Sequence, residues 1–127
     1  MKVAVISANF GNYDSFKDLT NIKDKQLFDW YYFTDGNIIS DTYKIINTKY
    51  HDQTHNKNIL FVKYYKIQSH KIDLFSNYDY TIWMDASIQI LNPNFVNDVL
   101  DLLKNKPNLV MFKHGSRSKI KDEVDIL

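Results

Sequence analysis

The residue best placed to do chemistry is Asp85, a single acid that directly follows an apolar run. Residues 80–84 are aromatic and β-branched, which is typical of a buried strand. A carboxylate at the end of such a strand is costly unless a cation or hydrogen-bond donors compensate its charge. Ligands of open α/β sheets bind at this carboxyl end of the strands. We therefore place Asp85 at the centre of a candidate site.

Two other predicted strands also end in polar turns. Residues 2–7 are β-branched and lead into a turn with Gly11 and Asn12, where positive φ angles are tolerated. Such a start is typical of nucleotide-binding α/β units, although a plain turn explains the pattern equally well. Asp35 follows the predicted strand at residues 30–34 and is either a ligand-binding acid or a turn residue.

A basic turn, Lys113 to Arg117, follows the predicted strand at residues 108–112. Mg²⁺ and Mn²⁺ take carboxylate oxygens, and Mn²⁺ also accepts an imidazole nitrogen, so Asp85 and His114 are candidate metal ligands. Arg117 could hold a diphosphate as a bidentate fork. The alternatives are a surface histidine and an Asp85 that caps the segment beyond its strand.

Composition sets the class of protein. The chain has 127 residues, is 44% hydrophobic and 24% charged, and carries a net charge of +1 without any cysteine. These values predict one globular domain and exclude disulfides, thiol catalysis and cysteine-type zinc sites. The apolar N-terminal run is too short for a signal peptide or a membrane span, so we expect a cytoplasmic protein with no membrane partner.

The order of elements predicts an α/β domain with a mostly parallel sheet, because strands alternate with helices. The sequence predicts strands at residues 2–7, 30–34, 43–48, 80–84 and 108–112, and helices at residues 56–69, 93–104 and 120–127. Loops 10–14, 85–87 and 113–117 then meet at one edge of the sheet. The predicted last helix is unfinished and has no C-cap, which suggests association into a homo-oligomer.

The predicted helix at residues 56–69 carries lysines among aromatic residues. Leu60, Tyr64 and Ile67 fall on one face at helical spacing, with Phe61 and Tyr65 beside them, which predicts that this face is buried. Interleaved lysines and aromatics can bind single-stranded nucleic acid. With a net charge of +1, a solvated edge is the favoured interpretation, and nucleic acid is not expected as a partner.

Residues 62–91 resemble a family of glycosyltransferase-like domains, long catalogued only as a domain of unknown function, whose plant members are linked to pectin and mucilage polysaccharides. The family pattern is K-x-x-K, an apolar residue, x-H-x-x-F and then Y-D-Y-x-I-W-I-D. Its residues are matched here by Lys63, Lys66, His70, Phe75, Tyr78, Asp79, Tyr80, Ile82, Trp83 and Asp85. Residues 112–117 with Glu123 are similar to the family's F-K-H-x-x-R followed by a glutamate, and residues 11–14 and 33–35 also fit in kind and order.

The resemblance implies one Rossmann-like domain of the GT-A type over residues 1–127. It implies transfer of a sugar from a nucleotide-sugar, UDP-type, to a glycan or protein acceptor, usually with Mn²⁺ or Mg²⁺. The implied catalytic residues are Asp85 and Lys66, and the implied metal ligands are Asp85 and His114. The implied donor-binding residues are Phe10, Asn12, Tyr13, Asp35, Lys63, Ser87 and Arg117.

Two departures from this pattern suggest an alternative. The usual D-x-D motif has a second acid where this chain has Ser87, a poorer metal ligand. GT-A enzymes also continue beyond the point where this sequence stops. A minimal or truncated version of the fold, which binds a nucleotide-sugar or glycan without turnover, is the alternative expectation.

Overall fold

The central strand of the sheet is β1 (Val3–Asn9), and all seven of its residues are buried. Its residues are small or β-branched, which suits a strand covered on both faces. The computed structural model describes residues 1–48 and 55–110, with the backbone alone for residues 55–57. Predictions for residues 111–127, among them the turn with Lys113, His114 and Arg117 and the last helix, lie outside the described residues.

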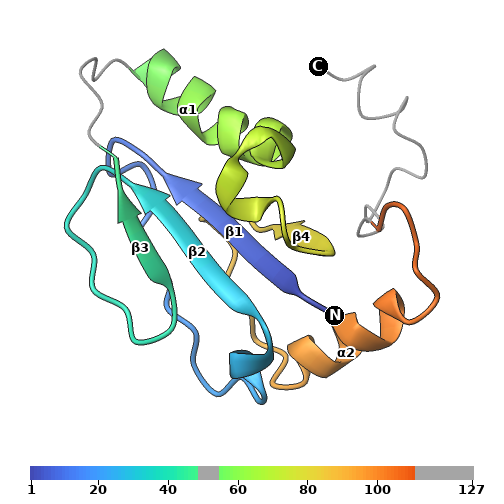
Figure 1. Cartoon of the computed structure of the whole chain (residues 1–127). Helices are drawn as coiled ribbons and strands as arrows, with labels where there is room; N and C mark the ends of the chain where they lie inside the picture. Colours follow the sequence, from blue (N-terminus) through green and yellow to red (C-terminus); the bar gives the residue numbers. More distant parts are fainter. Residues whose placement is uncertain (49–54, 111–127) are drawn as a thin grey trace, which may run out of the picture.

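Four parallel strands form the sheet, in the order β3-β2-β1-β4 (Figure 1). The other three strands are β2 (Asp29–Thr34), β3 (Lys44–Asn47) and β4 (Tyr80–Trp83). The prediction of a Rossmann-like α/β domain is confirmed. The predicted starts and ends of these four strands agree with the structure to within two residues.

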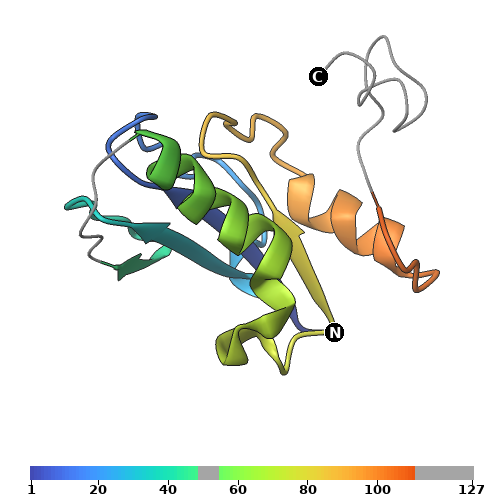
Figure 2. The ribbon, with the colours of Figure 1, turned by 90° about the horizontal axis from the view of Figure 1, so that it is seen from above.

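Helices and loops cover both faces of the sheet. Figure 2 shows α1 (His55–Gln68) running across the sheet, with β4 between it and α2 (Phe95–Leu103). Three single-turn 3₁₀ helices occupy the connections: η1 (Lys25–Leu27), η2 (Ser69–Lys71) and η3 (Asp73–Phe75). No helix among the described residues is long and apolar enough to cross a membrane.

The core on the α2 side of the sheet is rich in aromatic rings. Val5 of β1 packs there with Val96 and Leu103 of α2. Tyr43, just before β3, contacts the rings of Trp30 and Tyr32 edge-on, with centroids 5.7 Å apart in each pair. Edge-on pairs of this kind stabilise a core beyond the area that they bury. The irregular connections between β1, β2 and β3 are held to the sheet by this cluster.

The core on the α1 side corrects the prediction of which helix face is buried. Tyr65 is buried and stacks on Phe33 at a centroid distance of 4.1 Å. Leu60, Tyr64 and Ile67 are instead exposed, by 62%, 47% and 61%. Apolar residues lie on almost every side of α1, so their spacing alone did not identify the face that meets the sheet.

Two further predictions about elements are wrong. Residues 108–110 form no strand and are exposed, although a buried strand was predicted from residue 108. The helix predicted from Pro93 starts at Phe95, and Asn92 stabilises the preceding turn, where its Oδ1 accepts the Asn94 N–H at 3.0 Å. The N-cap position is Asn94, two residues after the predicted cap at Asn92.

Replacement of Leu103 by alanine tests the α2 core. Leu103 is 5% exposed, and its neighbour Leu102 is 55% exposed. We expect Leu103→Ala to lower the free energy of unfolding by about 2–5 kcal/mol, because it leaves a cavity. Leu102→Ala is the matched control and should change it by less than about 0.5 kcal/mol. Urea unfolding measures both, and equal losses would contradict this packing of α2.

Tyr43 predicts a loss of stability in alkali. Burial, with the charge of Asp18 and the neighbouring Tyr32, raises the pKa of the Tyr43 phenol far above its ordinary value. Above about pH 10 the unfolded chain loses this proton while the folded chain keeps it, so unfolding becomes more favourable as the pH rises. We expect Tyr43→Phe to weaken this pH dependence by up to about 1.4 kcal/mol per pH unit.

The measurement is urea unfolding at several pH values between 8 and 12. Tyr64→Phe, at an exposed position of α1, is the control and should keep the dependence of the wild-type protein. A Tyr43→Phe protein with the same pH dependence as the wild type would show that this phenol is not the cause.

Candidate functional site

The order of the strands creates a crevice at the carboxyl end of β1. The chain passes from β1 to β2 and β3 on one side, and then α1 returns it to β4 on the other side of β1 (Figure 1). The connection from β1 to β2 packs on the α2 face of the sheet, where Phe16 and Ile22 join the core, whereas α1, which leads into β4, packs on the other face. Ligands of open parallel sheets bind at such a point.

The loop after β1 is held in a fixed shape by its own polar groups. The Asn9 amide donates to the Asp14 carbonyl at 2.6 Å and accepts the Asp14 N–H at 3.2 Å. Gly11 has a φ of 73° and Asn12 a φ of 53°, both in the left-handed region. A Cβ atom at Gly11 would lie 2.8 Å from Cγ of Asn58, so α1 also requires glycine there.

Asp35, at the end of β2, fixes this loop from the neighbouring strand. Its carboxylate accepts the Gly11 N–H, with oxygen–nitrogen distances of 3.1 and 3.3 Å. The adjacent turn is closed by Thr34 instead, whose Oγ1 accepts the Gly36 N–H at 3.1 Å. Asp35 therefore connects two loops rather than forming a turn of its own.

Between these two loops lies an open cleft of about 470 Å³. It is lined by Asn9, Gly11, Asn12, Asp14, Phe16, Thr34, Asp35, Gly36, Asn37 and Ile38. The charged side chains among these lining residues are the two carboxylates of Asp14 and Asp35. Amide, hydroxyl and carboxylate groups at the rim suit a ligand rich in hydroxyl and N–H groups, and they do not suit a phosphate.

Asp85 lies on the other side of β1, at the end of β4. Its Oδ1 accepts the indole N–H of Trp83 at 2.7 Å and lies 3.8 Å from Nζ of Lys66 on α1. The side chains of Lys66 and Asp85 are each about half exposed, at 50% and 51%. The charge of Asp85 is thus compensated by one indole donor and one ammonium, and both groups remain open to solvent.

A second lysine, Lys17, reaches the same turn from the loop after β1. Its Nζ donates to the Ala86 carbonyl at 3.4 Å and to the Ser15 carbonyl at 3.3 Å. Sequence reasoning missed this residue, because it belongs to a polar stretch with no motif. Lys17 links the loop after β1 to the turn after β4 and brings a second positive charge to the residue that follows Asp85.

The predicted metal site is not assembled by the described residues. No group of three or more His, Asp or Glu side chains among them could hold a metal ion. Ser87 is exposed next to Asp85, at the position where a D-x-D motif has its second acid. His114, the other predicted ligand, lies outside the described residues, as does Arg117.

The remaining predicted donor-binding residues differ in their positions. The prediction that Phe10 lines the donor pocket is corrected by the structure. This residue is 1% exposed, stacks on Tyr65 and meets Phe61 edge-on, so it belongs to the core. Tyr13 is 70% exposed in the loop after β1 and is not part of the cleft lining. Lys63 is exposed on α1. Asn12 and Asp35 share the cleft.

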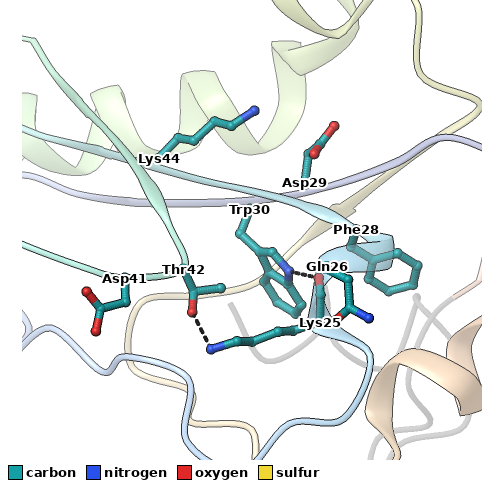
Figure 3. A pocket seen from close by; sticks show the side chains of 8 residues that line it. All are labelled: Lys25, Gln26, Phe28, Asp29, Trp30, Asp41, Thr42 and Lys44. Atoms are coloured by element: carbon teal, nitrogen blue, oxygen red, sulfur yellow. Dashed lines mark hydrogen bonds between the residues drawn. The ribbon is translucent and has the colours of Figure 1, made fainter.

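Another hollow, of about 270 Å³, lies at the opposite end of β2 and β3 (Figure 3). Its polar groups are largely bonded to one another or to neighbours. Lys25 Nζ donates to Thr42 Oγ1 at 2.9 Å, Trp30 Nε1 donates to the Lys25 carbonyl, and Asp29 accepts the Tyr78 hydroxyl. These pairs give the hollow a structural role, and the carboxyl edge of the sheet remains the candidate site.

Comparisons with family models, with curated proteins and with solved structures find no match to this chain. The resemblance to glycosyltransferase-like domains therefore stays a prediction from the sequence.

Replacement of Gly11 by alanine tests the shape of the loop after β1. We expect Gly11→Ala to lower the free energy of unfolding by about 2–4 kcal/mol, because alanine is strained at this φ and its Cβ meets Asn58. Gly36→Ala is the control, since the nearest atom to a Cβ there is Thr34 Oγ1 at 3.5 Å. Thermal or urea unfolding that gives equal losses for both variants would contradict the loop geometry.

Proposed function

We propose that the chain binds a nucleotide-sugar at the carboxyl edge of its sheet and transfers the sugar to a glycan or protein acceptor. The observation that carries the proposal is the meeting of the loops after β1, β2 and β4 at one edge, through the Gly11–Asp35 and Lys17–Ala86 contacts. Separate loops that are tied together at a topological switch point form the usual binding site of such folds. The sequence resemblance independently indicates the same class of ligand.

The two flanks of β1 have different chemistry, which matches the two halves of a nucleotide-sugar. The cleft beside Asp35 has carboxylate and amide groups, which suit the hydroxyl and N–H groups of a nucleoside. The flank beside Asp85 has the ammonium groups of Lys66 and Lys17, which suit a diphosphate. The nucleoside is therefore assigned to the β1–β2 side and the diphosphate to the β1–β4 side.

In this proposal Lys66 stabilises the leaving diphosphate, and Asp85 orients Lys66. Cleavage of the bond between the sugar and the diphosphate leaves negative charge on a phosphate oxygen, and a fixed ammonium nearby lowers the barrier. The Trp83 indole N–H orients the Asp85 carboxylate, which lies 3.8 Å from the Lys66 ammonium. A divalent cation would supply the same charge neutralisation when bound.

The alternative function is binding of a nucleotide-sugar or glycan without turnover. It is favoured by the exposed Ser87 beside Asp85, where a second carboxylate is absent from the described residues. The two functions differ in one product: an enzyme releases free nucleoside diphosphate from the donor, and a binding module does not. Release of UDP or GDP that stops in Asp85→Ala would decide for the enzyme.

Isothermal titration calorimetry with UDP, GDP and their sugars tests the proposed site. We expect Asp35→Ala to weaken binding of the nucleotide at least tenfold, or by about 1.4 kcal/mol, because the Gly11 loop loses its tether and the cleft loses a carboxylate.

Asp101→Ala is the matched control, since this exposed acid lies on α2 in a surface pair with Lys104 and should leave the affinity unchanged. Failure of all donors to bind the wild-type protein would end the proposal. Unchanged nucleotide binding by Asp35→Ala would show that the β1–β2 cleft is not part of the nucleotide site.

A further inference from the structure

We infer that Lys17 and Lys66 together hold the diphosphate in place of a divalent cation. The inference rests on the proposed function and concerns how the same site neutralises charge. Lys17 comes from the loop after β1, Lys66 comes from α1, and both meet the turn that follows β4. Positive charge thus reaches the switch point from two independent elements.

The contacts of Lys66 leave it free to bind an anion. Its Nζ is 3.8 Å from one oxygen of Asp85, a loose ion pair, and its side chain is half exposed. That oxygen also accepts the shorter Trp83 N–H bond at 2.7 Å, so the acid is already partly satisfied without the lysine. An ammonium has three N–H donors, and this arrangement leaves donors available for phosphate oxygens.

Lys17 carries a charge that no acid among the described residues compensates. Its two hydrogen bonds go to the backbone carbonyls of Ser15 and Ala86, and it forms no ion pair with any described residue. Backbone carbonyls orient an ammonium without cancelling its charge. Two ammonium groups and the Asp85 carboxylate therefore meet at this turn, and both ammonium groups keep N–H donors that a phosphate group could accept.

The same contacts oppose a divalent cation at this turn. Among the described residues the turn offers a divalent cation one carboxylate, Asp85, so waters and the substrate's own phosphates would have to supply its other ligands, and Lys17 already bonds the adjacent Ala86 carbonyl. The ammonium of Lys66, 3.8 Å from Oδ1 of Asp85, would repel a cation at this carboxylate. Charge neutralisation by two lysines accounts for the Lys66–Asp85 ion pair, and it explains why Ser87 can stand where a D-x-D motif has its second acid.

The test is calorimetric titration of the full chain with UDP and GDP, each in EDTA and again in excess Mn²⁺. We expect the wild-type affinity in EDTA to lie within about threefold of that in Mn²⁺. Lys17→Met and Lys66→Met should each weaken binding in EDTA at least tenfold, and Lys66→Arg should retain most of the affinity.

Two controls separate a lost phosphate contact from a damaged fold. Binding of uridine or guanosine, which lack phosphate, should be unchanged in both methionine variants. Lys104→Met, at an exposed position of α2, should bind UDP or GDP as the wild type does. A methionine variant that also loses the nucleoside would show a structural effect and overturn the assignment for that lysine.

The outcomes distinguish this inference from the proposed function. Binding of UDP or GDP that requires Mn²⁺ and survives both methionine substitutions would overturn the two-lysine site while the proposed function stands. Absence of any nucleotide binding, with or without Mn²⁺, would overturn both. Metal-independent binding that both lysine variants weaken would support the inference.

Discussion

The structure depends on the burial of β1, which is paired with a strand on each side and covered on both faces. Between Val3 and Ala8 no residue of this strand lines the candidate cleft, and Asn9, its last residue, is the first that does. Polar groups can therefore gather only where the strand ends, at Asn9 and beyond. The left-handed turn at Gly11 follows from that constraint, because the chain must leave a covered strand within a few residues.

Charge compensation then determines the chemistry of this edge. Asp35 follows β2 and Asp85 follows β4, the two strands that flank β1, yet the partners of the two carboxylates differ. Asp35 accepts a backbone N–H beside the cleft, whereas Asp85 accepts an indole N–H and faces a lysine. One flank is consequently acidic and the other is basic. This division is the physical basis for placing the two halves of a nucleotide-sugar.

The sequence was sufficient for the parallel sheet, because its strands are apolar runs that are followed by polar turns and alternate with helical patterns. It was not sufficient for the buried face of α1, where Leu60 and Tyr64 are as apolar as Phe61 and Tyr65 and only the sheet selects between them. Phe10 was misassigned because a loop residue next to a glycine can still point into the core. The contact of Lys17 with Ala86 spans 69 residues, and no local pattern predicts it.

The central claim is that a nucleoside diphosphate binds at the carboxyl edge of the sheet, on both flanks of β1. Amide chemical shifts in a ¹⁵N-labelled sample, followed during titration with UDP or GDP, test it most directly. The account predicts changes at Gly11, Asp35 and Asp85 and none around Trp30 and Thr42 at the opposite end. Changes confined to that opposite end would contradict it.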